Sequence, residues 1–209
     1  MARSRPTSEP VAPSPTRERL LEEAIHAIER GGEAAVNVRE VAAACGVTSP
    51  IIYKGFGSRD GLIVAAQAER FGRVIDAIAA PFVAAVESAT TVDELRTIVE
   101  LLLAATHDPS RAGFRRIQFD VMGASVHRPA LRSAVDDALQ ALVQRSAAAL
   151  EVARTRGLVR GDLALPEMVW WFFGQVQGRF LVEQSTAVID SEAWNRSSRE
   201  AVLTLLFGG

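Results

Sequence analysis

The chain has 209 residues, of which 48% are hydrophobic and 23% are charged, and its formal net charge is -2. A charge so close to neutral excludes a bulk polycation, so any binding to nucleic acid has to come from local placement of basic residues. No apolar run approaches the ~20 residues that a membrane span needs, and the N-terminus has no hydrophobic signal segment, so we expect a cytoplasmic protein.

Residues 1–13 are predicted to be a disordered tail. Four of the nine prolines fall within the first 15 residues, and residues 1–19 carry four arginines against two glutamates. A polar, proline-rich segment of this kind cannot bury enough apolar surface to fold. It has the charge to reach along DNA phosphates or into a minor groove, but a solvated tail without a role is the simpler alternative.

Residues 14–57 are predicted to form a small helical domain, beginning with a helix from Ser14-Pro15 to Gly31-Gly32. An apolar stripe at helical spacing marks its buried face, namely Leu20, Leu21, Ala24, Ile25 and Ile28. The stripe predicts that one face of this helix packs against the elements that follow.

Two short helices are predicted next, joined by a tight turn. Asn37 is a good cap for the first of them, and Gly46 lies just past its end, where a left-handed backbone is cheap only for glycine. Thr48 or Ser49 caps the second, and Pro50 stands in its first turn, where a missing N–H costs nothing. The pattern predicts a helix-turn-helix.

The second short helix has distinct inner and outer faces. Ile52 and Phe56 are four residues apart and are predicted to anchor it inwards. The outer face then consists of Ser49, Pro50, Ile51, Tyr53 and Lys54. A short rigid helix presenting small and basic groups suits the major groove of DNA.

Residues 46–62 also follow a longer pattern, G-V-[ST]-x-x-x-[IL]-Y-x-x-F-x-[SN]-[KR]-[DE]-x-L. The matching positions are Gly46, Val47, Thr48, Ile52, Tyr53, Phe56, Ser58, Arg59, Asp60 and Leu62. In this pattern the first third of the chain resembles the TetR family of one-component transcriptional regulators. Two positions depart from it. Gly55 stands where the family often has a His or Tyr that contacts the DNA backbone, and Ile51 where a small or hydroxylated residue is common.

The resemblance implies a set of DNA contacts. Arg39 aligns with a position that reaches base edges or phosphate, and a guanidinium can make a bidentate bond to guanine. Tyr53 and Lys54 are then expected on phosphates, as is Arg59 in the first turn of the next helix. The full expected set is Asn37, Val38, Arg39, Thr48, Ser49, Pro50, Ile51, Tyr53, Lys54 and Arg59. Singly, Arg39 could instead pair with a nearby acid, and Tyr53 could serve only helix packing.

Residues 58–209 are predicted to form a C-terminal ligand-binding and dimerisation domain. Its helices are expected from Ser58, with Pro81 breaking or kinking that helix, from Thr91, at about 110–123, at 129–156 with Gly157 ending it, from Pro166 to Leu181, and from about Ser191 to Phe207. No strand pattern is visible, so the predicted fold is all-α with about nine helices. The helix that begins at Ser58 would connect the two domains.

A homodimer is expected to form through the last two helices. Gly174 and Gly178 are four apart, which lets another helix approach closely, and in TetR-like proteins these helices form a four-helix dimer interface. The predicted interface comprises Trp171, Gly174, Gly178, Trp194, Ala201, Val202 and Leu205. The alternative is that both helices are simply core. Dimerisation is favoured because one recognition helix reads too few base pairs for useful specificity.

The family also implies a small-molecule effector. Its expected pocket comprises Phe71, Phe114, Gln118, Met122, Trp171 and Gln175, a mixture of apolar and neutral polar groups that predicts an apolar or aromatic ligand with few charges. Core packing is the alternative for any one of them. Arg179 could pair with an acidic group of a ligand, but Glu183, one turn further on, is the simpler partner.

Nothing in the sequence favours an enzyme, a cofactor or a metal site. His26, His107 and His127 are scattered without ligand spacing, and Cys45 is expected to be a packing residue. Three hypotheses therefore remain. The first is a dimeric repressor that a ligand releases from a palindromic operator on double-stranded DNA, and the second is a dimeric DNA-binding regulator without a ligand. The third is a helical enzyme or binding module whose helix-turn-helix is coincidental.

Overall fold

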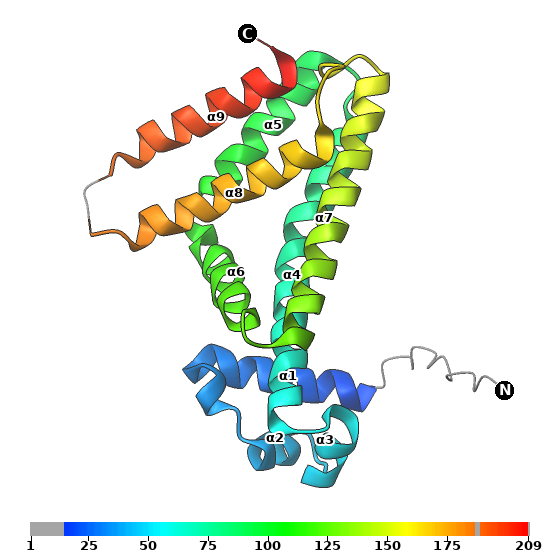
Figure 1. The fold of residues 1–209 in the computed structure, drawn as a ribbon, viewed down its shortest axis with the longest axis vertical. Coiled ribbons are helices and arrows are strands. Elements are labelled where there is room, and N and C mark those ends of the chain that lie inside the picture. Colours follow the sequence, from blue (N-terminus) through cyan, green and yellow to red (C-terminus); the bar gives the residue numbers. More distant parts are fainter. Residues whose placement is uncertain (1–14, 187–188, 209) are drawn as a thin grey trace, which may run out of the picture. The chain divides into compact units, whose positions relative to one another are not determined.

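The computed structural model describes residues 15–186 and 189–208, and in these residues it contains nine α-helices and no strand (Figure 1). The helices are α1 Pro15–Gly31, α2 Val38–Ala44, α3 Ser49–Phe56, α4 Arg59–Ser88, α5 Val92–His107, α6 Ala112–Ser125, α7 Pro129–Thr155, α8 Leu165–Gln184 and α9 Ser191–Phe207, with short 3₁₀ helices η1 Glu33–Ala35 and η2 Pro109–Arg111. The predicted all-α fold is confirmed. The tail predicted over residues 1–13 lies outside the described residues.

The chain divides into two compact units, residues 1–69 and 70–209. The division falls inside α4, whereas the boundary expected from the sequence stood at the start of that helix. Leu62, Ile63 and Ala66 explain the difference, because they are buried in the same core as the helices before them. The beginning of α4 is therefore part of the N-terminal unit.

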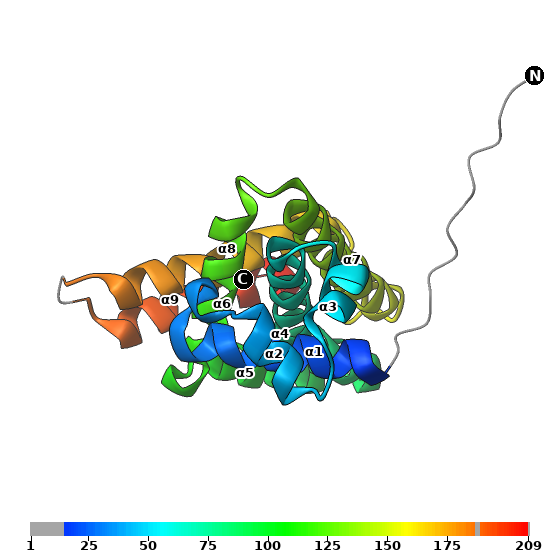
Figure 2. The same ribbon diagram turned by 90° about the horizontal axis from the view of Figure 1, so that it is seen from below.

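In the N-terminal unit, α1, α2 and α3 pack around one apolar core (Figure 2). The turn after α2 is the one that the sequence predicts, with Gly46 at a φ of 67°. The Val47 N–H donates to the Ala42 carbonyl at 2.9 Å, and the Gly46 N–H donates to the Ala43 carbonyl at 3.0 Å. These two bonds satisfy the last carbonyls of α2 and fix the direction in which α3 leaves.

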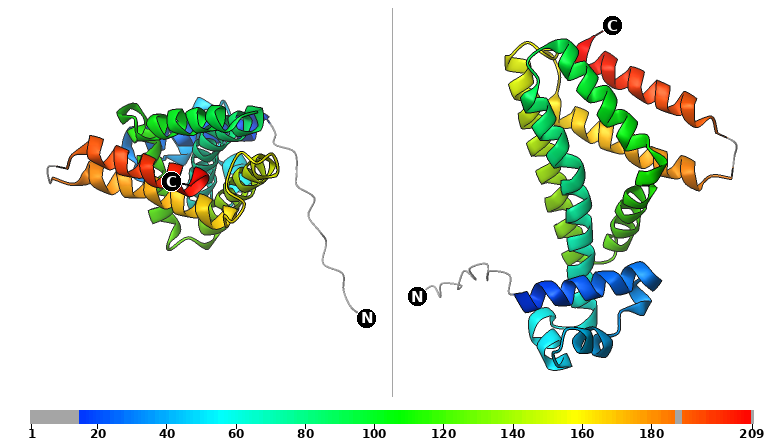
Figure 3. Two further views of the ribbon diagram at one scale, coloured as in Figure 1. Left: turned by 90° about the horizontal axis from the view of Figure 1, so that it is seen from above. Right: turned by 180° about the vertical axis from the view of Figure 1, so that it is seen from behind.

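In the C-terminal unit, α7 lies beside the second half of α4, and α5 packs against both α8 and α9 (Figures 1 and 3). One apolar core joins residues of α4, α5, α7, α8 and α9. Polar contacts also tie α7 to α4: Arg145 Nη1 lies 2.8 Å from Asp76 Oδ1, and Arg156 Nη1 donates to the Glu87 carbonyl at 3.0 Å. Gly157 ends α7 with a φ of 73°, as predicted.

Helix α4 continues through Pro81, so the predicted break is absent. Proline removes the hydrogen bond to the carbonyl four residues earlier, which here belongs to Ala77. Both Pro81 and Ala77 lie on the exposed face of the helix, where water can take the place of the lost donor. The helix therefore tolerates this proline.

Gly61 occupies a position in the first turn of α4 that has no room for a side chain. The Ser58 hydroxyl caps this turn by accepting the Gly61 N–H at 2.9 Å, and a Cβ on Gly61 would lie 2.0 Å from the Phe56 carbonyl oxygen. Gly61→Ala is therefore expected to lower the free energy of unfolding by about 1–3 kcal/mol, since the backbone must shift. Urea denaturation of the full chain measures this change.

Gly55→Ala is the matched control in the same unit. Gly55 lies within α3, and a Cβ there would meet nothing within 4 Å. Alanine should raise the free energy of unfolding by about 0.5–1 kcal/mol at such a site. Equal effects of the two substitutions would show that the close approach to Phe56 is not what requires glycine at position 61.

Candidate nucleic-acid interface and ligand cavity

Helix α3 packs against the core of the N-terminal unit with one face and exposes the opposite face to solvent. Ile52 has no exposed surface, and Phe56 packs against the same core, with the Arg17 guanidinium 4.9 Å from the centre of its ring. Ile51 and Tyr53 are 43% and 50% exposed. The inner and outer faces are the ones that the spacing predicts. The outer face presents both an apolar side chain, that of Ile51, and a hydrogen-bonding hydroxyl, that of Tyr53.

The two short helices begin with different caps. The Asn37 carbonyl oxygen accepts the Arg39 N–H at 2.9 Å and the Glu40 N–H at 3.4 Å, while its amide donates to the Glu40 carboxylate at 3.0 Å. Asn37 is therefore the predicted cap of α2. Thr48 is the cap residue of α3, but its hydroxyl makes no capping hydrogen bond. The Thr48 side chain is exposed at the start of the recognition helix.

Most of the predicted DNA contacts are on the surface of the N-terminal unit. The exposed members are Asn37, Arg39, Thr48, Pro50, Ile51, Tyr53 and Lys54, and Ser49 is half-buried. The Val38 side chain is buried in the core of the unit, one turn before Val41 on the inner face of α2. The resemblance implies that the start of this helix approaches a phosphate, so a contact at Val38 would be made by its backbone.

Arg59 is exposed at the start of α4, and its guanidinium also binds the protein itself. Its Nε donates to the Val36 carbonyl at 2.7 Å, and its Nη2 donates to the Glu33 and Ala34 carbonyls at 2.6 and 3.3 Å. Gln67 adds a bond of 2.9 Å from its amide to the Glu33 carboxylate. Arg59 therefore fastens α4 to the η1 turn before α2, and its contact with a DNA phosphate stays a prediction.

Cys45 is buried at the end of α2, facing the core. Burial raises the pKa of its thiol, and the nearby Arg19 guanidinium opposes that shift only in part. A raised pKa leaves less thiolate, which is the reactive form. The structure thus supports the predicted packing role.

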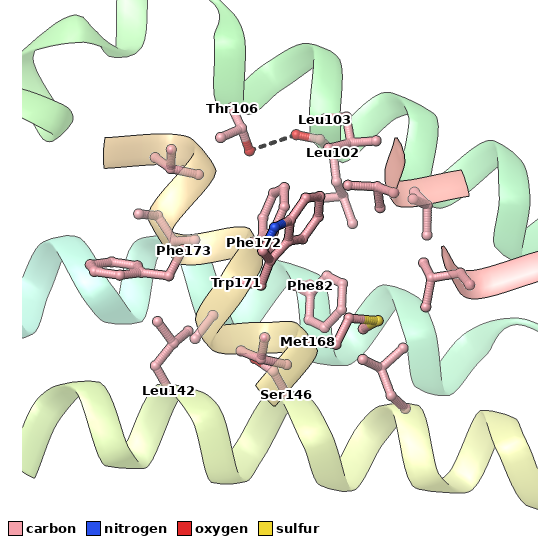
Figure 4. Close-up of a pocket in the computed structure, with 18 of the residues that line it drawn as sticks. Phe82, Leu102, Leu103, Thr106, Leu142, Ser146, Met168, Trp171, Phe172 and Phe173 are labelled. Atoms are coloured by element: carbon pink, nitrogen blue, oxygen red, sulfur yellow. Dashed lines mark hydrogen bonds between the residues drawn. The ribbon is translucent and has the colours of Figure 1, made fainter. Parts of the chain in front are cut away.

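The C-terminal unit holds an apolar cavity of about 110 Å³. Figure 4 shows aromatic and aliphatic side chains around it, including Phe82 of α4, Leu102 of α5 and Met168, Trp171 and Phe172 of α8. Few polar side chains reach it. One is Thr106, whose hydroxyl already donates to the Leu102 carbonyl at 2.8 Å. The lining therefore fits hydrocarbon.

Two of the six residues predicted for a ligand pocket, Gln118 and Trp171, line this cavity. Phe71, Phe114 and Met122 are not among its lining residues, and Gln175 lines a separate, open groove with residues of α9. Phe71 is fully buried, and the Phe114 ring lies 5.6 Å from the Arg111 guanidinium. The helices that carry these groups were expected to converge, but the sequence did not tell which of the groups face one shared cavity.

The surface of α8 carries large apolar side chains. Trp170, Trp171 and Leu181 are exposed there, and Ile189 is exposed just before α9. Trp170 and Leu181 were missed by the sequence analysis, although together with Gly174 they follow helical spacing. An apolar stripe of this kind is typical of a protein interface.

Some of the residues predicted for a dimer interface lie on the surface of the C-terminal unit, and others are buried. Trp171 and Gly174 are exposed, and Trp194 and Ala201 are half-buried. Val202 is a correction because it is buried in the core, and Leu205 lines the cavity. A Cβ on Gly178 would lie 3.5 Å from the Trp194 ring of the same chain, an ordinary van der Waals contact, so Gly178 faces α9 within one chain.

The part of the chain that the structure describes contains no group of three or more metal-binding side chains. In the same residues, no helix combines the length and apolar character of a membrane span.

Comparison with known proteins relates the chain to regulators of transcription. The family model of the bacterial regulatory proteins of the tetR family matches residues 20–66. This stretch runs from α1 into α4 and includes the whole helix-turn-helix. No curated protein matches the chain.

Solved structures share the fold along nearly the whole chain. A putative TetR-family transcriptional regulator from Mesorhizobium loti is 18% identical with a TM-score of 0.67, over 92% of this chain and 96% of that one. A second one, from a Rhodococcus species, is 20% identical with a TM-score of 0.64, over 91% and 98%. The regulator FadR from Bacillus subtilis, in complex with stearoyl-CoA, is 16% identical with a TM-score of 0.57, over 92% and 98%.

Proposed function

We propose that the chain is a DNA-binding transcriptional regulator of the TetR family, and that it acts as a dimeric repressor released from a palindromic operator by a small apolar or aromatic ligand. The observation that carries the proposal is the geometry of α3, where Ile52 is buried while Ile51 and Tyr53 on the other face are half exposed. The repressor would act in the cytoplasm, on double-stranded DNA.

The proposed DNA contacts divide into base and phosphate contacts. Arg39 would read a base edge, and Pro50 and Ile51 would pack against a thymine methyl group. Tyr53 and Lys54 would bind phosphates, which position the helix without carrying sequence information. Thr48 and Ser49 hydroxyls can donate or accept, so they would read bases loosely.

We assign dimerisation to α8 and the segment just before α9, where Trp170, Trp171, Leu181 and Ile189 lie exposed. Burying such a stripe against a second copy removes a large apolar area from water. Two copies would offer their recognition helices to half-sites about 34–36 Å apart, one turn of DNA. This is the geometry that a palindromic operator requires.

The ligand would occupy the cavity of the C-terminal unit, whose lining is almost wholly apolar. The structural similarity to FadR in complex with stearoyl-CoA is compatible with an apolar effector. A ligand shifts the protein away from its DNA-binding conformation only by as much as it favours the other conformation. A regulator without any ligand remains the alternative.

Gel-shift assays with the DNA upstream of the protein's own gene test the proposal, together with size-exclusion chromatography and light scattering. The wild type is expected to be dimeric and to bind one sequence in a salt-sensitive way. Leu181→Glu should give a monomer with operator affinity lower by roughly tenfold or more, since a charge is placed in the interface.

Leu101→Glu is the matched control, because Leu101 of α5 is equally exposed but lies off the proposed interface. It should remain dimeric and bind the operator normally. A monomeric wild type, or the same behaviour in both variants, would refute the assigned interface. Adding apolar compounds to the gel shifts distinguishes the two regulators. Release of the DNA supports the ligand-responsive repressor, and unchanged binding supports the regulator without a ligand.

A further inference from the structure

A buried charged cluster lies where α5, α6 and α8 meet in the C-terminal unit. It consists of His107, Arg115, Arg179 and Glu183, whose side chains are almost completely buried except for the partly covered Glu183. The four groups are close enough for both arginines and the carboxylate to act on His107. Two guanidinium groups therefore share one carboxylate inside the protein.

Arg115 forms a bidentate ion pair with the Glu183 carboxylate, with one hydrogen bond to each oxygen. Its Nε donates to Glu183 Oε2 at 3.0 Å and its Nη2 to Oε1 at 2.5 Å, while the Thr106 and Asp108 carbonyls accept from its Nη1 and Nη2 at 2.6 and 3.2 Å. A guanidinium with this set of partners is fully compensated. Asp108, at the exposed edge, directs its own carboxylate to the Ser110 N–H.

Arg179 has far fewer polar partners than Arg115. Its Nε lies 3.4 Å from Glu183 Oε1, without hydrogen-bond geometry, and in the described part of the chain its buried Nε and Nη1 have no hydrogen-bond partner. His107 Nε2 is buried and lacks a partner in the same residues. Burial lowers the pKa of His107, and the two arginines lower it further, so the imidazole adds no charge near neutral pH. With two arginines and one carboxylate, the four side chains of the cluster carry a net charge of +1.

A buried charge without a partner is costly, and buried polar groups in proteins normally have hydrogen-bond partners. The missing partner here has to be negative, small and able to accept several hydrogen bonds. A carboxylate meets all three conditions. The atoms without partners belong to Arg179 and His107, and both side chains are more than nine-tenths buried.

The cluster adjoins the apolar cavity through three residues. Thr106 lines the cavity and its carbonyl accepts from Arg115, and Gln118, one turn after Arg115, lines it with a buried amide nitrogen that has no partner in the described residues. Val176 lines the cavity one turn before Arg179. One end of the cavity is thus next to a site for negative charge.

We propose that the cluster binds the carboxylate of a small apolar acid, with Arg179 and His107 donating to the oxygens and the hydrocarbon part lying in the cavity. This inference rests on the proposed ligand response and narrows the effector to an organic acid. The volume limits the size, because a cavity of about 150 Å³ holds one benzene ring and this one measures about 110 Å³. The hydrocarbon part is then no larger than one ring or a short chain.

Thermal unfolding of the full-length, DNA-free protein with benzoate, benzamide or inorganic phosphate, at equal ionic strength, tests the proposal. Benzoate should raise the melting temperature by about 5–10 °C at roughly 100-fold excess over its Kd, whereas neutral benzamide and phosphate should leave it unchanged. Equal shifts with benzoate and benzamide would overturn the carboxylate site. A shift with phosphate alone would show a bare anion site without the apolar part and would overturn it as well.

Two variants with opposite effects on the buried charge sharpen the test. Arg179→Gln removes the surplus charge, so its melting temperature without ligand should not fall below that of the wild type, while its response to benzoate is lost. Glu183→Gln removes the only carboxylate of the cluster and so increases its net positive charge. This variant should have a lower melting temperature than the wild type without ligand, and benzoate should raise that temperature by more than in the wild type. Arg179→Lys, which keeps the charge, should retain part of the response.

A full benzoate response in Arg179→Gln would refute the assignment of Arg179. Operator binding by the ligand-free protein is measured separately in gel shifts. A failure of the benzoate test would leave the DNA-binding dimer intact, whereas a benzoate response without operator binding would retain the acid site and remove the repressor.

Discussion

Ile52→Ala is expected to lower the free energy of unfolding by about 2–5 kcal/mol, as measured by urea denaturation of the full chain. The side chain of Ile52 is completely buried in the core of the N-terminal unit. Truncating it removes apolar contacts and leaves a cavity beneath α3. Because this residue anchors the recognition helix, operator binding should be lost together with stability.

Ile51→Ala is the matched control one residue earlier. Ile51 is 43% exposed on the outer face, so its truncation should change the free energy of unfolding by less than about 0.5 kcal/mol. Operator affinity should still fall, because the proposed contact with a thymine methyl group is lost. The reverse order of stabilities would mean that the inner and outer faces of α3 are wrongly assigned.

Arg39→Ala and Lys54→Ala are expected to weaken operator binding in different ways. Loss of a base-reading guanidinium at position 39 should cost about 1–3 kcal/mol on the preferred sequence and relax the choice of base at one position of each half-site. Loss of the Lys54 charge should weaken binding to all sequences alike and reduce the salt slope by about 1. Gel shifts on an operator library at several salt concentrations measure both quantities.

Arg145→Ala serves as the control for charge. Arg145 is an exposed arginine of the C-terminal unit that pairs with Asp76, so its removal changes the net charge equally without touching the proposed interface. Its operator affinity and salt slope should match those of the wild type. An unchanged base preference in Arg39→Ala would assign that arginine to phosphate instead of a base.

Local chemistry made the helix-turn-helix predictable from the sequence. Asn37, Gly46 and Ser58 are recognisable caps or turn residues, and each acts within a few residues of itself in the structure. Ile52 and Phe56 separate the two faces of α3 by spacing alone. Such signals are read correctly because they depend on neighbours in the chain, not on the tertiary fold.

The errors arose where a role depends on distant residues. The bonds of Arg59 to carbonyls 23 to 26 residues earlier were not foreseen, because no local pattern encodes such a contact. The ligand pocket shows the same limit, because neither the buried Phe71 nor the partly buried Met122 lines the cavity. In the buried cluster, only Arg179 and Glu183 were foreseeable as a pair, since Arg115 lies 68 residues from its carboxylate partner.

The bonds from Arg59 and Gln67 to the η1 turn bear on how a mutational scan of this domain should be interpreted. They hold residues 33–36 in place immediately before the cap of α2 and Arg39. An alanine at position 59 is expected to loosen that cap, so operator recognition would be impaired even if Arg59 made no contact with a phosphate. Weakened affinity in such a variant therefore does not by itself show a phosphate contact, whereas a direct footprint of the guanidinium on DNA would.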